Sequence, residues 1–373
     1  MKIPKIVLLT AATLAASLFP NLLGAQPSSN VHVWVTGLNG PRGLKFGPDG
    51  KLYVAEAGTG GTTSTAGACT QVIAPIGPYL GGNTSRISSI NSAGTRTTVA
   101  SGFPSTVDTM GDMLGVMDLA FVDGTLYALE GGAGCSHGDS LPNGLYSVNT
   151  KTGSWKLVAN LSEFIQTHMV KYPNPPDFEP DGTFYSMVEF HNRLYAVEPN
   201  HGQIVSIGMD GSMASVMDVS ASQGHIVPTA ITARDGQFYL GNLNLFPIQP
   251  NYARIQTLGY AECSQVAAPG LDDTGAVHSL HILSSKAGFT TVVGTAFGPD
   301  GLLYVLELSD AAGYPTPGDG KVVRVKADGD IEDVATGLVV PTAMTFGPDW
   351  KLYVSNFGAA PPGTGQIVRI DIP

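Results

Sequence analysis

Phe46-Gly-Pro-Asp-Gly-Lys-Leu-Tyr-Val-Ala-Glu56 contains the end of an apolar strand, a Pro-Asp-Gly turn and a second strand that starts with Leu-Tyr. Variants of this phrase recur at residues 121–130, 189–198, 233–242, 297–307 and 346–356. Asp-Gly between two β-rich runs is a strong hairpin signal. Each copy is therefore predicted to form a β-hairpin, and each ends in Glu or Asn.

A second hairpin follows most copies of the phrase. Examples span residues 85–100, 144–158 and 322–334, each with a polar turn between two β-rich runs. Four antiparallel strands per repeat, in six repeats, is the pattern of a six-bladed β-propeller, an all-β fold. The tyrosines near the start of the second strands, such as Tyr53 and Tyr353, recur too regularly to form a ligand cage and are predicted to pack between blades.

The two ends of the chain indicate how the ring closes. Residues 30–38 end in Thr-Gly-Leu, as do residues 330–338, which are predicted to be the outer strand of the fifth repeat. The last repeat, from Pro341, supplies three strands and lacks a fourth. The N-terminal segment is therefore predicted to complete the last blade as its outer strand, which leaves no open sheet edge.

Residues 1–25 have the pattern of a secretory signal peptide. Lys2 and Lys5 precede an apolar run over residues 6–19, and small residues end the segment at Ala25. The run is too short for a membrane span. We therefore expect residues 26–373 to form one propeller domain that is secreted or periplasmic, with no membrane insertion after the signal is removed.

The charge of the chain restricts its partners. Charged residues make up only 13% of the 373 residues, the formal net charge is −11, and Lys and Arg form no cluster. Nucleic acids and anionic membranes bind proteins largely through basic patches. The sequence therefore argues against nucleic acid as a partner and leaves small molecules, glycans and proteins.

Long insertions concentrate on one face of the predicted ring. Counting strands outward from the axis places five of them together, at residues 57–84, 101–116, 160–181, 243–252 and 308–320. The opposite face has short turns, except for a long insertion at residues 261–275. Because binding residues tend to lie on long loops of rigid scaffolds, the long-loop face is the predicted binding face.

Six polar residues close the second strands of the repeats at this face. They are Glu56, Glu130, Glu198, Asn242, Glu307 and Asn356. Converging carboxylates bind cations or raise one another's pKa, so these residues are candidate ligand-binding groups. In the alternative, each carboxylate accepts hydrogen bonds from backbone N–H groups of its own loop.

The middle repeats add a denser polar group. It comprises Asp177, Glu179, Asp181, His201 and His225, joined by His137 from the neighbouring repeat. Carboxylate and imidazole groups together can hold a divalent cation such as calcium or move protons. The group contains no His-x-x-x-His motif, so the cofactor stays unknown, and each histidine could instead bond a carbonyl oxygen.

Three cysteines, Cys69, Cys135 and Cys263, allow at most one intramolecular disulfide. Cys69 and Cys135 lie in equivalent loops of adjacent repeats and are the better pair. The sequence equally allows three unpaired thiols, because it does not supply the distance between Cα atoms that a bridge requires.

Several phrases together resemble the secreted propellers of the ScyD/ScyE type, which are named after proteins encoded with the scytonemin pathway of cyanobacteria. They include Gly134-Cys-Ser-His-Gly138, Asp177-Phe-Glu-Pro-Asp-Gly-Thr183, Glu198-Pro-Asn-His-Gly202 and Gly224-His-Ile-Val-Pro-Thr229. The resemblance covers nearly the whole chain after residue 25. It implies export and a propeller but no particular activity. Many members of this family have paired cysteines within the first long loop, whereas Cys69 has no partner there.

Two functions fit these observations. The first is an exported binding or accessory protein that presents its long-loop face to a small molecule, glycan or protein. The second is an enzyme similar to metal-dependent lactonases, with carboxylates and histidines at the channel mouth. Fold analogy alone supports the enzyme, and the chain has no Gly-x-Ser-x-Gly nucleophile motif. We therefore favour a binding function.

Overall fold

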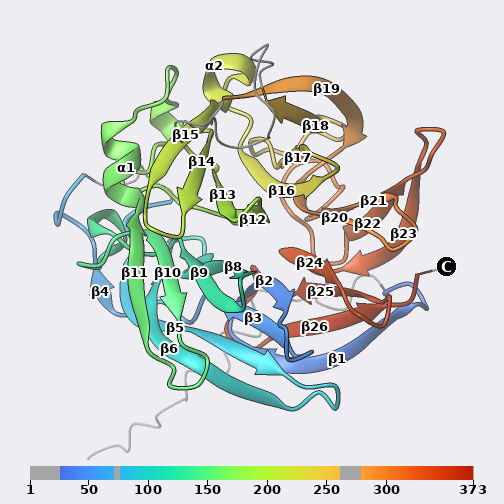
Figure 1. The fold of residues 1–373 in the computed structure, drawn as a ribbon, viewed down its shortest axis with the longest axis horizontal. Coiled ribbons are helices and arrows are strands. Elements are labelled where there is room, and N and C mark those ends of the chain that lie inside the picture. The colour runs from blue at the N-terminus through green and yellow to red at the C-terminus, as the bar shows by residue number, and fades with distance from the viewer. Residues whose placement is uncertain (1–25, 71–75, 261–278, 373) are drawn as a thin grey trace, which may run out of the picture.

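The computed structural model describes residues 26–70, 76–260 and 279–372. Its six antiparallel sheets are arranged as blades around one axis, which confirms the predicted six-bladed β-propeller (Figure 1). The signal peptide predicted at residues 1–25, the insertion at residues 261–275 and Cys263 lie outside the described residues.

In each blade the strands run outward from the axis of the ring. Blade 1 contains β2 (Pro41–Phe46), β3 (Leu52–Glu56), β5 (Leu80–Ile90) and β6 (Arg96–Val107), to which the short strands β4 (Thr63–Ser64) and β7 (Met113–Leu114) pair. Blade 2 contains β8 (Val116–Val122), β9 (Thr125–Glu130), β10 (Gly144–Val148) and β11 (Trp155–Asn160). Blade 3 contains β12 (Ser186–Phe190), β13 (Arg193–Glu198), β14 (Gln203–Gly208) and β15 (Met213–Asp218).

The second half of the ring has the same order. Blade 4 contains β16 (Pro228–Arg234), β17 (Gln237–Asn242), β18 (Ala253–Tyr260) and β19 (Leu280–Phe289). Blade 5 contains β20 (Val292–Phe297), β21 (Leu303–Glu307), β22 (Gly320–Val325) and β23 (Ile331–Leu338). Blade 6 contains β24 (Ala343–Phe346), β25 (Leu352–Asn356), β26 (Gly365–Ile370) and β1 (Val31–Leu38).

Short helical segments lie in the connections. They are α1 (Leu161–Thr167), α2 (Val219–Gln223) and two 3-10 segments, η3 (Cys135–His137) and η4 (Pro175–Asp177). Asn160 and Asp218 begin the two α-helices, and their side chains accept hydrogen bonds from backbone N–H groups of the first turn, as N-caps do. Among the described residues, no helix is long and apolar enough to cross a bilayer.

The strand β1 closes the ring, as the sequence predicted. It pairs antiparallel with β26, and Val33 stands opposite Val368 in the ladder. The side chain of Asn30 reinforces this closure, because its Nδ2 donates to the carbonyl of Val334 in blade 5 at 2.9 Å and to that of Asp371 at 3.0 Å. The N-terminal strand therefore covers the edge that the last repeat leaves open.

The repeated aspartate and tyrosine of the hairpins act within and between blades. In three repeats the tyrosine hydroxyl donates to the aspartate of the preceding turn, in the pairs Tyr53–Asp49, Tyr304–Asp300 and Tyr353–Asp349. The same rings pack edge-on against a phenylalanine of the next blade, in the pairs Tyr53–Phe121, Tyr304–Phe346 and Tyr353–Phe46. Such pairs contribute about 0.5–1.5 kcal/mol beyond area burial. The predicted packing of the tyrosines between blades is confirmed, and the last pair joins blade 6 to blade 1.

The innermost strands fill the centre of the ring. The space that remains along the axis is about 40 Å³ and is lined by residues from all six blades. Packing this close requires glycine at position 43, because a Cβ there would lie 2.0 Å from Oδ1 of Asp118. The same carboxylate accepts a hydrogen bond from the backbone N–H of Met187 in blade 3 at 2.8 Å. A ligand therefore has access to the faces of the propeller rather than to a through-going pore.

Blade 1 extends further than the sequence indicated. The strands β5 and β6 have 11 and 12 residues, and their ladder continues past Ser85 to pair Leu80 with Val107. The predicted strand begins at residue 85, and the two glycines that the observed strand adds at positions 81 and 82 are disfavoured in strands. The extension carries Tyr79 and Asp108 to the long-loop face, where they line a cavity.

Closure by β1 predicts a sharp contrast between two of its residues. Leu38 is fully buried and packs in a cluster with residues of blades 1 and 6, whereas Val33 is 57% exposed on the same strand. Leu38→Ala should therefore lower the free energy of unfolding by about 2–5 kcal/mol, and Val33→Ala by no more than about 0.5 kcal/mol. Urea denaturation of the two variants measures both values. Equal effects would contradict the closure.

Candidate ligand-binding site

A cavity of about 610 Å³ opens above the closed centre, on the long-loop face. We call it the mouth cavity. Its walls come from the connections of blades 1 to 4, and its floor contains Arg42, Met117 and Tyr185, which also line the narrow axial space. Its apolar wall residues include Ile76, Leu114, Pro176, Pro199, Val227, Leu243, Leu245 and Phe246. Both the volume and the mixed wall are typical of sites for small organic molecules.

The floor of the mouth cavity holds a buried guanidinium. Arg42 is only 3% exposed, and its Nη2 donates to Oδ1 of Asp112 at 2.7 Å and to the carbonyl of Met113. The Nε of Arg42 has no hydrogen-bond partner within the described part of the chain. A buried charge is tolerated only when it is paired, so Asp112 neutralises Arg42 and ties the inner strand of blade 1 to the β6–β7 connection.

Asp108 lies in the same connection and is poised to titrate near neutral pH. Its Oδ1 accepts hydrogen bonds from the backbone N–H groups of Met110 at 2.9 Å and Asp112 at 2.8 Å. Burial and the charge of Asp112 outweigh these bonds and raise the pKa of the Asp108 carboxyl from its usual 3.8 to about 6. Asp108 is therefore the group in the mouth cavity that can gain or lose a proton near neutral pH.

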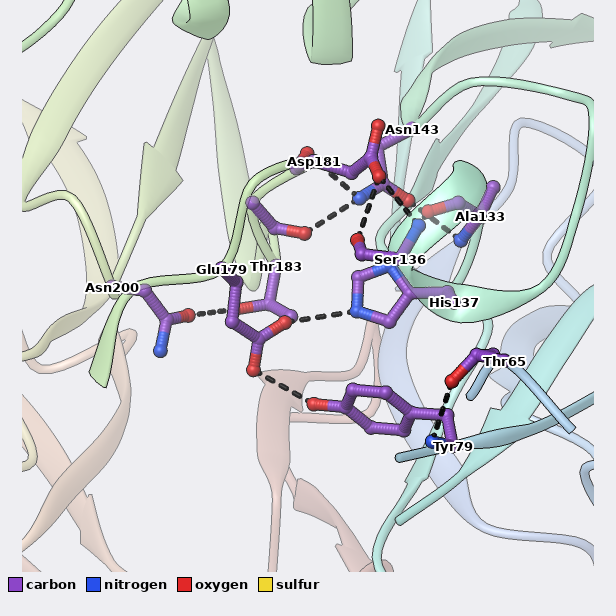
Figure 2. A network of polar contacts seen from close by, with 12 residues as sticks. Thr65, Tyr79, Ala133, Ser136, His137, Asn143, Glu179, Asp181, Thr183 and Asn200 are labelled. Carbon is purple, nitrogen blue, oxygen red and sulfur yellow. Dashed lines mark hydrogen bonds and ion pairs between the residues drawn. The ribbon is translucent and has the colours of Figure 1, made fainter. Parts of the chain in front are cut away.

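A buried polar chain forms one wall. Figure 2 shows the Glu179 carboxylate between two partners, the ring of His137 and the hydroxyl of Tyr79. The distances are 2.8 Å from His137 Nε2 to Glu179 Oε2 and 2.8 Å from the Tyr79 hydroxyl to Glu179 Oε1. The second ring nitrogen of His137 lies 2.6 Å from the carbonyl of Ala133. This chain joins the connections of blades 1, 2 and 3.

The pKa values of His137 and Tyr79 are shifted by burial and by the neighbouring Glu179. Burial alone would lower the pKa of His137, but the hydrogen bond and charge of Glu179 and the Ala133 carbonyl raise it overall. Burial and the Glu179 charge raise the pKa of Tyr79 well above its usual value. Tyr79 is therefore protonated at all ordinary pH values and donates to Glu179, which keeps the carboxylate oriented along the cavity wall.

Asp181 anchors the loop that carries Glu179. Its Oδ2 accepts hydrogen bonds from the backbone N–H and the hydroxyl of Ser136, at 2.8 and 2.6 Å (Figure 2). Its backbone carbonyl accepts a hydrogen bond from Nδ2 of Asn143 at 3.0 Å. Asp181 is 6% exposed and does not line the mouth cavity. Its observed role is thus to position Glu179 rather than to face the cavity.

The remaining members of the predicted cluster are arranged around the same loop. Asp177 lines the mouth cavity, and its Oδ2 lies 2.7 Å from Nε2 of His225. His201 is 1% exposed, stacks on Phe178 and directs Nε2 to the carbonyl of Glu179 at 2.8 Å. The alternative expected for a loop histidine, a bond to a carbonyl, is therefore observed at His201.

The six residues that close the second strands do not meet at the mouth cavity. Each accepts a hydrogen bond from a backbone N–H at 2.7 to 2.9 Å, and all are at most 4% exposed. Glu56 is also held by Nε and Nη2 of Arg86, and burial raises the pKa of Glu130 well above its usual value. Of the six, only Asn242 lines a described cavity, the neighbouring one on blade 4. Glu130 and Glu198 accept from backbone N–H groups of their own loops, as the alternative expected, whereas Glu56 and Glu307 accept from the connection that leads into their blade. A ligand-binding role for the six residues stays a prediction.

The described residues contain no group of three or more His, Cys, Asp or Glu side chains arranged to hold a metal ion. The carboxylates of the mouth cavity are separately engaged, Asp112 with Arg42, Glu179 with His137 and Tyr79, and Asp177 with His225. The fourth carboxylate, Asp108, accepts hydrogen bonds from backbone N–H groups.

The two described cysteines lie near one another. Cys69 and Cys135 both carry thiols in this structure. Burial, together with a hydrogen bond to Cys135, raises the pKa of the Cys69 thiol to about 12. Cys69 and Cys135 are thus neighbours, as their positions in adjacent repeats predicted, and no disulfide joins them in this structure.

Several residues of the cavity were not singled out by sequence reasoning. Tyr79, Asp108 and Asp112 lie within the long insertions at residues 57–84 and 101–116, but neither their residue type nor their spacing distinguished them. Arg42 could have been found, because it is an isolated arginine at the start of a predicted inner strand. Of the predicted residues, Asp177 and Glu179 line the mouth cavity, while His137 and His225 contact those two.

Comparisons with known proteins establish the fold and no more. No family model and no characterised protein matches the sequence. A gluconolactonase from Xanthomonas campestris is 11% identical, with a TM-score of 0.53 and coverage of 95% of this chain and 93% of that chain. A proposed oxidoreductase (glucose dehydrogenase) from Thermus thermophilus is 18% identical, with a TM-score of 0.54 and coverage of 91% and 99%. A protein of unknown function from Bacteroides thetaiotaomicron is 11% identical, with a TM-score of 0.53 and coverage of 92% and 76%.

The raised pKa of Asp108 predicts a pH-dependent stability difference. A carboxyl whose pKa is about 6 in the folded state and 3.8 in the unfolded state stabilises the fold at low pH and loses this contribution as the pH rises through about 6. Asp108→Asn keeps the Oδ1 acceptor but cannot ionise. Its free energy of unfolding relative to the wild type should therefore be higher at about pH 7 than at about pH 4.

Urea denaturation at the two pH values measures this difference. Asp210→Asn is the matched control, because the exposed Asp210 has a lowered pKa and its replacement should shift stability in the opposite direction. If the free energy of unfolding of Asp108→Asn relative to the wild type is the same at both pH values, the raised pKa of Asp108 is contradicted.

Proposed function

We propose that this protein is an exported β-propeller that binds a small organic molecule in the mouth cavity. The observation that supports this most is the cavity itself, about 610 Å³ in volume, closed below and walled by loops from four blades. Buried hydrogen bonds hold its polar side chains before any ligand arrives. Such preorganisation lowers the cost of ordering a site on binding.

The wall chemistry indicates the class of ligand. Among its described lining residues, the mouth cavity has four carboxylates, Asp108, Asp112, Asp177 and Glu179, and one guanidinium, that of Arg42. The remaining wall is largely apolar. A neutral or cationic molecule with an apolar frame and several hydrogen-bond donors suits this surface, whereas an anion would meet like charges.

We also propose that the protein is exported and that it is a propeller of the ScyD/ScyE type. The segment at residues 1–25 has the composition of a cleaved leader, and the phrases around His137, Asp177, His201 and His225 resemble the ScyD/ScyE type. These phrases supply the wall and its supporting residues. A ScyD/ScyE-type accessory protein that captures a small molecule outside the cytoplasm fits both features.

A thermal-shift screen with a library of small amines, phenols and polyols tests the binding proposal. A ligand that binds only the folded state raises the melting temperature with concentration. Leu114→Trp places a larger side chain in the cavity and should abolish the shift, whereas Asp210→Asn on the opposite face should leave it unchanged. A shift that persists in Leu114→Trp, or no shift with any compound, would count against the proposal.

A second candidate is an acid–base enzyme that hydrolyses an ester or lactone. The observation that favours it is the Asp108 carboxyl, whose pKa of about 6 suits a general base near neutral pH. Proton removal from an attacking water by Asp108 would make the rate increase as the pH rises through about 6.

A panel of lactones and esters, assayed with added calcium or with a chelator, measures the rate. Asp108→Asn should lower the rate by at least ~100-fold, and the absence of turnover in both conditions would exclude this candidate.

A further inference from the structure

A second cavity of about 810 Å³ lies beside the mouth cavity on blade 4. We call it the blade 4 cavity. It is formed by the end of α2 and the residues after it, by the connection between β17 and β18, and by the start of β18 (Figure 1). It shares Asn244, Leu245 and Phe246 with the mouth cavity, so this short segment is the wall between the two.

The blade 4 cavity differs in chemistry from the mouth cavity. Six of its thirteen lining residues are amides, namely Gln223, Asn242, Asn244, Gln249, Asn251 and Gln256. No carboxylate is present among its described lining residues, and only Arg254 and His225 can be positively charged. Amides offer paired donors and acceptors without charge. The surface therefore suits a polyhydroxylated ligand better than an ion.

Two of these side chains, Gln256 and Asn244, each have one buried polar atom that makes no hydrogen bond within the described structure. Gln256 is 2% exposed and donates through Nε2 to Oε1 of Gln223 at 2.9 Å, but its Oε1 accepts no hydrogen bond within the described structure. Asn244 accepts through Oδ1 from Nδ2 of Asn242 at 2.9 Å, whereas its Nδ2 is a buried donor with no acceptor there. Buried polar groups are nearly always satisfied. Two residues that line one cavity thus each hold a buried polar atom whose hydrogen-bonding capacity is open, and a hydroxyl group can both donate and accept.

Aromatic rings stand at the edge of the same cavity. Tyr252 and Phe246 line it and are 64% and 43% exposed. Phe246 is stacked on Tyr314 of the β21–β22 connection, with ring centroids 6.2 Å apart and planes 16° apart. The backbone bridge between Ile248 and Gly313 holds these two connections together. Clustered exposed apolar side chains can mark a binding site, and the flat face of an aromatic ring matches the apolar face of a sugar ring.

We propose that the blade 4 cavity is a saccharide-binding site. Hydroxyl groups of the sugar occupy the open acceptor of Gln256 and the open donor of Asn244, while the C–H face of the ring packs on Tyr252 or Phe246. The side chain of Arg254, for which no ion pair is found among the described residues, is available to the carboxylate of a uronic acid. This site is independent of the ligand proposed for the mouth cavity.

Binding to an array of neutral oligosaccharides and oligouronates, followed by calorimetric titration of the best hit, tests the proposal. Gln256→Met removes both polar atoms at similar volume, and Tyr252→Ala removes the ring, so each should weaken binding at least ~tenfold. Trp350→Ala is the control, because Trp350 is also 64% exposed but lies in the turn between β24 and β25, away from the cavity. Arg254→Gln should weaken the binding of a uronate but not that of a neutral sugar, so this variant distinguishes the two classes of saccharide.

The results separate this proposal from that of the mouth cavity. Leu114→Trp should leave saccharide binding unchanged, because Leu114 lines only the mouth cavity. Gln256→Met loses the hydrogen bond to Gln223 but also removes a buried acceptor that is unsatisfied, so the ligand-free variant should unfold at a urea concentration close to that of the wild type. No saccharide bound at millimolar concentration, or equal affinity in the wild type, Gln256→Met and Tyr252→Ala, would overturn the proposal.

Discussion

The antiparallel pairing of β1 with β26 is the constraint on which the rest of the structure depends. It joins the two ends of the chain in one sheet and converts a row of six hairpin repeats into a ring. The edge-on contact between Tyr353 and Phe46 then packs blade 6 against blade 1 in the same way as other neighbouring blades. Without this closure, the first and last blades would each expose an apolar flank, and the long loops would have no common centre.

The ring places loops from distant parts of the sequence around one point. Tyr79 and Glu179 are 100 residues apart in the chain, yet their side chains are hydrogen-bonded across two blades. Arg42 on the inner strand of blade 1 meets Asp112 from the last connection of the same blade. The rigid blades therefore supply the frame, while the loops supply the chemistry.

The polar groups of the long-loop face form two sets that differ in what they contact. Glu56, Glu198 and Glu307 accept hydrogen bonds from backbone N–H groups of the connections that lead into their blades, which ties those connections to the ends of the second strands. Asp108 and Glu179 lie on connections that extend above the strands and face open space. The first group keeps the loops in place, so the second group can hold buried charge near a ligand without further reorganisation.

The two cavities on this face divide the chemistry between them. The mouth cavity is acidic and partly apolar, whereas the blade 4 cavity is rich in amides and edged by aromatic rings. Only the short segment around Asn244 separates them. A propeller is well suited to such an arrangement, because each blade contributes its own loop and neighbouring loops can differ without disturbing the strands.

The sequence by itself determined the architecture of this protein. Six copies of a hairpin phrase, each with Tyr at a set position and five of them with Asp in the turn, encode local turns and a periodic core, and both depend on residues close together in the chain. The Thr-Gly-Leu shared by residues 30–38 and 330–338 indicated closure, because it marked the N-terminal segment as an outer strand without a repeat of its own. Spacing along a strand also predicted which face the loops occupy.

Only the tertiary structure decided which of the polar residues reach a cavity. Glu56 and Glu179 look equally promising in sequence, but Glu56 is bound by Arg86 and the backbone of Asn39, while Glu179 lines the mouth cavity. Asp108 gains its raised pKa from burial and from Asp112, and neither is visible in a motif. Hydrogen bonding and desolvation depend on distances of a few ångströms between segments from different loops and blades, and a linear pattern carries no such distances.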